Sequence, residues 1–175
     1  VVALIATVGF GFLFLRLAFL MRGEDAPGWG GIILTTGNTL LFMLEVLVIS
    51  AVIVVVHELL HAVGFRAFTG EGAKFGFKGL YAYAGAPDWY LPRNQHIVTL
   101  LLPLVVITAV GVLLMAFVPP AWLAEVVLAL VLNAAGAVGD LLALVWRLIR
   151  PPTAYVNDYG DGLIIFLPSD TQERA

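Results

Sequence analysis

The sequence of 175 residues contains no cysteine and few charged residues. Without cysteine there is no disulfide, no thiolate nucleophile and no cysteine-ligated zinc. Only 12% of the residues are charged, whereas 61% are hydrophobic, and the mean hydropathy is +1.01. Because about a quarter of the residues of a soluble domain are charged, this composition excludes a soluble monomer and a disordered chain. The 9 basic residues and the net charge of −3 argue against a nucleic-acid-binding protein.

Long apolar runs dominate the sequence instead. A transmembrane helix needs about 20 mostly apolar residues to cross the ~30 Å hydrocarbon core of a bilayer. The runs are too long for strands and do not alternate between apolar and polar residues. We therefore predict an all-α, polytopic membrane protein with four transmembrane helices, at residues 1–21, 40–66, 97–118 and 121–149.

The basic residues predict the orientation of these spans. Arg22 alone lies on one side, whereas the other side has Arg66, Lys74, Lys78, Arg93, Arg147, Arg150 and Arg174. Since basic loops stay in the cytoplasm, the middle loop, the tail and both termini are expected there. We thus expect an integral protein of a prokaryotic plasma membrane. It would have a single transmembrane domain at residues 1–150 and a cytoplasmic C-terminal tail at residues 151–175.

The second predicted span ends with the motif His57-Glu58-Leu-Leu-His61. On a helix, positions i and i+4 lie on one face, one turn apart. The two imidazoles can therefore bind one metal ion, and Glu58 beside them can accept a proton from water on that metal. Ionisable groups in an apolar helix are costly and indicate function by default. The alternative is a solvated helix end, although apolar residues continue past His61.

A catalytic zinc site needs a third protein ligand and an open position. Asp140 is a candidate, because it and His61 both lie roughly 7–11 Å inside the cytoplasmic boundary at 1.5 Å per helical residue. Asn133 lies seven residues earlier on nearly the same helix face. For both residues the alternative is a hydrogen bond between helices. His96 is another candidate ligand, but a histidine at a span boundary more often faces solvent.

At this point the residues resemble a known group. An intramembrane HExxH motif, followed two spans later by Asn and Asp on one helix face, is similar to the site-2 protease group of intramembrane zinc metalloproteases. From the second span onward the chain more closely resembles the putative zincin peptidase family of small membrane proteins. That likeness rests on the HExxH motif, Phe75-Gly-Phe77, Leu91-Pro-Arg93 with Leu102-Pro103, and the segment 133–140.

This resemblance implies roles for five residues. The metal ligands would be His57, His61 and Asp140, and Glu58 would be the general base. Asn133 would orient the substrate or the oxyanion. Ala134 and Leu141 depart from the site-2 protease pattern, which usually has Pro soon after the Asn and Gly directly after the Asp.

The middle loop interleaves aromatic and small residues between Lys74 and Tyr83, which predicts a short β-hairpin. One interpretation is an edge strand that pairs with an unwound substrate backbone. The other is an aromatic belt at the headgroup level, formed by Tyr81, Tyr83, Trp89 and Tyr90. In the tail, residues 155–162 predict a turn and residues 163–167 a short strand that pairs with the loop.

Arg16 and Glu45 are the other charges inside predicted spans. A helical wheel puts Glu45 about 120–160° away from the two histidines. We therefore expect a structural Arg16–Glu45 ion pair between the first and second spans.

Together these observations predict an enzyme, a zinc metallopeptidase with Zn²⁺ as cofactor. It would hydrolyse a peptide bond in a membrane-embedded or membrane-adjacent peptide or protein within the lipid bilayer, and so small a membrane protein could form a homodimer. Three alternatives remain open. They are a zinc-dependent hydrolase of a lipid amide or ester, a catalytically silent metal-binding membrane protein, and a small transporter with a His and Asp relay. The absence of a detectable inverted repeat makes the transporter the weakest.

Overall fold

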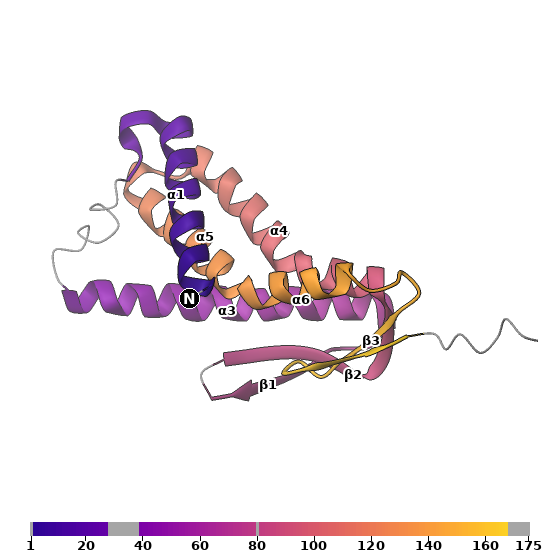
Figure 1. Ribbon diagram of the computed structural model, residues 1–175. Helices are drawn as coiled ribbons and strands as arrows, with labels where there is room; N and C mark the ends of the chain where they lie inside the picture. The colour runs from indigo at the N-terminus through magenta and orange to yellow at the C-terminus, as the bar shows by residue number, and fades with distance from the viewer. Residues whose placement is uncertain (1, 28–38, 80, 168–175) are drawn as a thin grey trace, which may run out of the picture. The chain divides into compact units, whose positions relative to one another are not determined.

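The computed structural model describes residues 2–27, 39–79 and 81–167 (Figure 1). Most of these residues are helical. The helices are α1 (Val2–Arg22), η1 (Gly23–Asp25), α3 (Thr39–Thr69), α4 (Arg93–Phe117), η2 (Pro120–Trp122), α5 (Leu123–Gly136) and α6 (Val138–Leu148). The strands are β1 (Lys74–Lys78), β2 (Tyr81–Pro92), β3 (Tyr155–Asp158) and β4 (Leu163–Phe166).

Three helical segments in the described part are long and apolar enough to cross a membrane: α1 with η1, α3 and α4. The fourth predicted span is not one continuous helix. It divides into α5 and α6, which are bent by 43° and pass the same test only as a pair. Gly136 ends α5, and glycine is a poor helix former that often marks a kink. The structure thus supports a membrane protein with three candidate spans, or four if the bent pair counts as one.

The chain forms two compact units. The first contains Val1–His57 and Pro103–Val138, and the second contains Glu58–Leu102 and Gly139–Ala175. Helices α3 and α4 each contribute residues to both units, and the unit boundary on α3 lies between His57 and Glu58. The HExxH motif therefore straddles that boundary on one unbroken helix.

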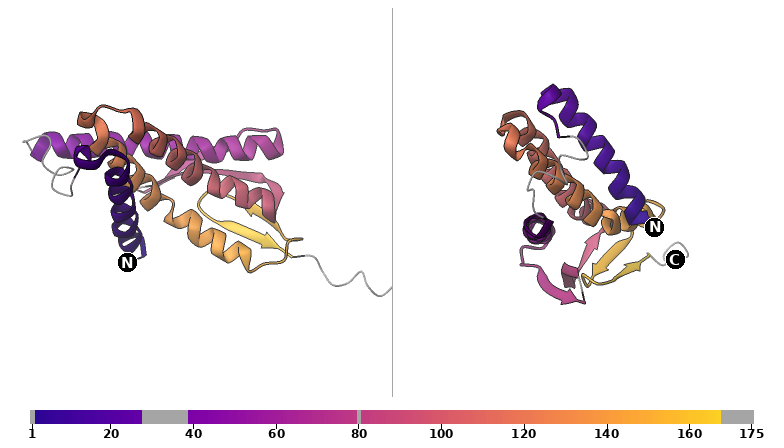
Figure 2. Two further views of the ribbon diagram at one scale, coloured as in Figure 1. Left: turned by 90° about the horizontal axis from the view of Figure 1, so that it is seen from above. Right: turned by 90° about the vertical axis from the view of Figure 1, so that its left-hand side faces the viewer.

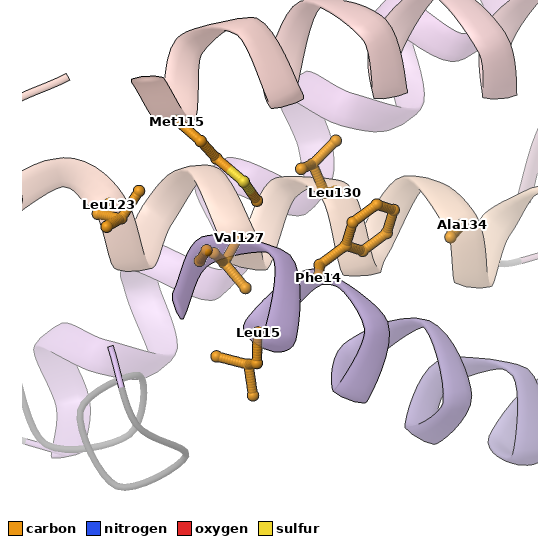
Figure 3. Close-up of a cluster of buried hydrophobic side chains, with 8 residues drawn as sticks. Phe14, Leu15, Met115, Leu123, Val127, Leu130 and Ala134 are labelled. Carbon is orange, nitrogen blue, oxygen red and sulfur yellow. The ribbon is translucent and has the colours of Figure 1, made fainter. Parts of the chain in front are cut away.

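An apolar cluster between α1, α4 and α5 forms the core of the first unit (Figure 3). Its buried members are Phe14, Leu15, Ala18, Met115, Leu123, Val127, Leu130 and Ala134. The four residues from α5 are spaced at i, i+4, i+7 and i+11, which places them on one stripe of the helix. Small residues on both helices, Ala18 and Ala134, allow α1 and α5 to pack closely.

Two charged groups of the first unit have partners that the sequence did not predict. Arg22 donates hydrogen bonds to the carbonyls of Met115 and Val118, at 3.0 and 2.8 Å, and so satisfies free carbonyls at the end of α4. Glu45 lies near Glu125 of α5, whose charge acts on it, whereas Arg16 is exposed. Among the described residues no ion pair joins Arg16 to Glu45, so the predicted Arg16–Glu45 pair is wrong.

The second unit contains an antiparallel sheet in the order β1-β2-β3-β4 (Figures 1 and 2). The predicted hairpin is confirmed as β1 and β2, with Phe75 opposite Ala84 and Phe77 opposite Ala82. The predicted tail strand is confirmed as β4, but it pairs with β3 rather than with the loop. The segment before it, predicted as a turn, contains β3, which pairs with β2 through Leu91 and Val156. The sheet is thus larger than the hairpin that the sequence suggested.

Candidate metal centre

His57 and His61 are buried on α3, and the Nδ1 atom of each ring is held by an oxygen acceptor. His57 Nδ1 lies 3.0 Å from Asn133 Oδ1, and His61 Nδ1 lies 3.0 Å from the backbone carbonyl of Thr99. Because these oxygens only accept hydrogen bonds, each Nδ1 carries the proton. Both rings are thereby fixed as the tautomer whose Nε2 is available to a metal.

Asp140 lies in the first turn of α6, directly after the break that follows α5. Its Oδ2 atom is 3.4 Å from Nε2 of His61. One ligand atom each from His57, His61 and Asp140 lies within 4.8 Å of the others. Two imidazole nitrogens and one carboxylate are ligands that zinc accepts in catalytic sites, where a fourth position stays open for water or substrate. The donor set of this cluster therefore fits zinc.

Glu58 follows His57 on α3 and is partly buried. It lies close enough to His61 for the two groups to interact electrostatically. The structure thus keeps a carboxylate near His61 of the cluster.

Asn133 lies in the last full turn of α5 and is completely buried. Its Oδ1 atom accepts the hydrogen bond from His57, so the amide orients a candidate ligand. Its Nδ2 atom has no hydrogen-bond partner among the residues that the structure describes. A buried amide donor of this kind is available to an acceptor on a bound molecule.

His96 does not face solvent, contrary to the sequence-based expectation, and does not belong to the His57, His61 and Asp140 group. It is completely buried and its Nε2 atom lies 2.6 Å from Oδ2 of Asp158 on β3. Arg147 of α6 is also fully buried beside it, at 3.4 Å. Sequence spacing gave no signal for this contact, because His96 and Asp158 are 62 positions apart.

Gly64, one turn after His61, marks a close approach between α3 and α4. A Cβ atom at this position would lie 3.1 Å from Cα of Thr99 and 3.0 Å from its side chain. The absence of a side chain therefore brings the Thr99 carbonyl within reach of His61. The sequence shows this glycine beside the motif, but nothing in the local pattern indicates its contact with Thr99.

The predicted aromatic belt is only partly exposed. Tyr81, Trp89 and Tyr90 are exposed, as a belt at the headgroup level requires. Tyr83 instead packs within the sheet, where its ring would meet a Cβ atom on Gly76 or Gly160. Strand β1 has a neighbour on one side only in the described sheet, so both interpretations of the hairpin remain available.

A comparison with protein families identifies the family of this chain. Residues 50–156, more than half of the chain, match a family described as "Putative zincin peptidase". The matched segment contains all five predicted site residues, His57, Glu58, His61, Asn133 and Asp140. Comparisons with curated proteins and with solved structures gave no match. The chain thus belongs to the putative zincin peptidase family.

Proposed function

We propose that this protein is an intramembrane zinc metallopeptidase that hydrolyses a peptide bond in a membrane-embedded or membrane-adjacent protein. The observation that carries the proposal is the pair of histidines on α3, each held through Nδ1, with Asp140 beside Nε2 of His61. Structural ion pairs do not need two oriented imidazole rings, whereas a metal site does. Membership of the family points to a metallopeptidase in the same way.

His57, His61 and Asp140 would hold the zinc. A zinc ion at this site supplies a Lewis acid for the scissile carbonyl and lowers the pKa of its water to about 7. Glu58 accepts the proton of the attacking water and later gives it to the leaving amine. Asn133 keeps His57 oriented and offers its Nδ2 donor to the carbonyl oxygen of the substrate.

The bent pair of α5 and α6 supports placement of this chemistry inside the bilayer. Irregular backbone is tolerated at membrane depth where it is buried in protein or lines a polar cavity. The break at Ala137 lies between Asn133 and Asp140, so it falls at the candidate centre. If the pair is one span, the chain crosses a prokaryotic plasma membrane four times, with both termini and the sheet in the cytoplasm.

A second candidate function is hydrolysis of a lipid amide or ester by the same residues. The first unit contains an apolar cavity of about 370 Å³. Its lining includes Ile53 and Ala129, which lie one helical turn before His57 and Asn133. The lining of this cavity is almost wholly apolar, which suits a lipid tail and favours the second candidate.

One experiment separates these functions. The wild-type protein and Glu58→Gln would be incubated in liposomes with solubilised membrane proteins and with lipid extract of the expression host. Peptidase activity predicts new protein termini, detected by mass spectrometry, that appear with the wild type and fall by at least about 100-fold with Glu58→Gln. Glu71→Gln is the matched control, because Glu71 is exposed and hydrogen bonds only to surface groups such as Trp89. Glu58-dependent lipid products without new protein termini would contradict the peptidase and support the second candidate.

A further inference from the structure

The second unit buries a polar cluster next to the candidate metal centre. It consists of His96 on α4, Arg147 on α6 and Asp158 on β3. Each of these residues is at most 9% exposed. The carboxylate of Asp158 accepts hydrogen bonds from His96 Nε2 at 2.6 Å and from the backbone amide of Gly160 at 2.7 Å. Asp158 is therefore held in place on two sides, and the cluster joins the sheet to two helices.

Arg147 requires a negative partner in this position. A guanidinium group keeps its charge, and a buried charge is costly unless it is paired. Arg147 donates a hydrogen bond to the Ala143 carbonyl at 2.8 Å, and the carboxylates whose charges act on it among the described residues are Asp158 and Asp140. Asp140 and Arg147 are seven residues apart, two turns along one face of α6. The charges of a candidate metal ligand and of a sheet carboxylate thus both act on Arg147.

We propose that Asp158 is a positioning residue for the metal centre, because it neutralises Arg147 and thereby leaves the Asp140 carboxylate to the metal. This inference rests on the zinc site of the proposed function. Without the charge of Asp158, Asp140 is the remaining carboxylate among these residues whose charge acts on Arg147. Arg147 then competes with the metal for Asp140, and a second positive charge nearby opposes cation binding.

The test is the zinc affinity of the purified, detergent-solubilised full chain, measured by competition with a chromogenic chelator. Asp158→Asn is expected to bind zinc about 10–100-fold more weakly than the wild type, as is usual when a residue behind a ligand is lost. The double variant Arg147→Met with Asp158→Asn removes both charges and is expected to bind zinc within a few-fold of the wild type. Asp161→Asn is the matched control, because Asp161 lies in the turn between β3 and β4 and pairs with Lys78 rather than with the cluster.

Recovery in the double variant distinguishes charge balance from general structural damage, since a purely structural role predicts that two changes are worse than one. The proposal is overturned if folded Asp158→Asn binds zinc as tightly as the wild type, or if the double variant is as weak as the single one. If Asp158→Asn does not fold, the double variant decides alone, because it buries no unpaired charge. No zinc binding by the wild type would refute the proposed function as well, whereas an unchanged Asp158→Asn refutes only this inference.

Discussion

The two units of the molecule bury different kinds of residue. The core of the first unit is apolar, with eight hydrophobic side chains from α1, α4 and α5 packed together (Figure 3). The second unit has a small apolar cluster of Phe65, Ala86 and Leu91. Most of its other buried groups are polar: His61, His96, Thr99, Arg147, Asn157 and Asp158.

This difference indicates a division of labour. Apolar packing gives shape and stability but no chemistry, whereas a buried polar group is stable only with its partners and is thus fixed in orientation. The second unit contains Glu58, His61 and Asp140, and within it the Thr99 carbonyl holds His61. Within the first unit, Asn133 makes a polar contact to a candidate ligand, His57.

The contrast between the two units has an exception, the polar contact between His57 and Asn133 in the apolar unit. Asn133→Leu removes the acceptor for His57 Nδ1, and we expect zinc affinity to fall about 10–100-fold. Asn133→Asp retains an acceptor oxygen and should bind zinc nearly as tightly as the wild type. Chelator competition measures both variants. Equal affinity of Asn133→Leu and the wild type would show that Asn133 does not orient the ligand.

Two glycines near the metal centre, Gly64 and Gly139, test whether close packing in the second unit orients its ligands. Gly64→Ala forces α3 and α4 apart at Thr99, which weakens the contact that orients His61, and should lower zinc affinity about tenfold. Gly139→Ala is the matched control, since nothing lies within 4 Å of a Cβ atom there although Asp140 is the next residue. Chelator competition again provides the measurement. A larger loss with Gly139→Ala than with Gly64→Ala would contradict the account.

A substitution in the apolar core should change stability and leave the metal alone. Leu130 is 1% exposed, and Leu130→Ala is expected to lower the free energy of unfolding by about 2 kcal/mol. This is the lower end for such changes, because a chain unfolded within lipid keeps its apolar surroundings. Leu113, which is 61% exposed, gives the control Leu113→Ala with little effect. Unfolding in mixed detergents measures stability, and a loss of zinc from folded Leu130→Ala would oppose the division of labour.

The smallest effect concerns an exposed ion pair of the sheet. The hydrogen bond from Lys78 lowers the pKa of the Asp161 carboxyl group from 3.8, and the same hydrogen bond raises the pKa of the Lys78 ammonium group from 10.5. The Asp161 contribution to stability is present above pH 3.8 and lost as pH falls through the lowered pKa. The Lys78 contribution is present below pH 10.5 and lost as pH rises through the raised pKa.

Between these limits, Asp161→Asn should lower the melting temperature slightly, because an exposed ion pair contributes little. Below the lowered pKa of Asp161 the variant and the wild type should melt alike. A difference that persists at that acid pH would show that Asp161 acts through something other than its charge.

Local patterns in the sequence predicted much of this structure. The i and i+4 spacing of His57 and His61 lies on one helix, so its geometry follows from the helical repeat alone. The depth of Asp140 in an apolar run pointed to the same level of the bilayer. The hairpin and the strand β4 followed from alternating residues and turn signals. Each of these features depends on neighbours within a few residues.

Contacts between distant segments could not be predicted in the same way. Asn133 was predicted on nearly the same helix face as Asp140, but the two lie on the separate helices α5 and α6, and the hydrogen bond of Asn133 to His57 spans 76 positions. His96 looked like a boundary histidine because Asp158 and Arg147, its actual neighbours, lay in other predicted elements. The break between α5 and α6 could not be predicted, because two short apolar helices that follow each other have the same apolar pattern as one long helix.

The most direct test of the central claim is the zinc content of the purified protein beside Asp140→Ala, with Asp161→Asn as a matched control. The account predicts about one zinc per chain in the wild type and in the control, and loss or marked weakening of zinc binding in Asp140→Ala. A wild type that holds no zinc after reconstitution, or a folded Asp140→Ala that retains it fully, would contradict the metal centre of His57, His61 and Asp140.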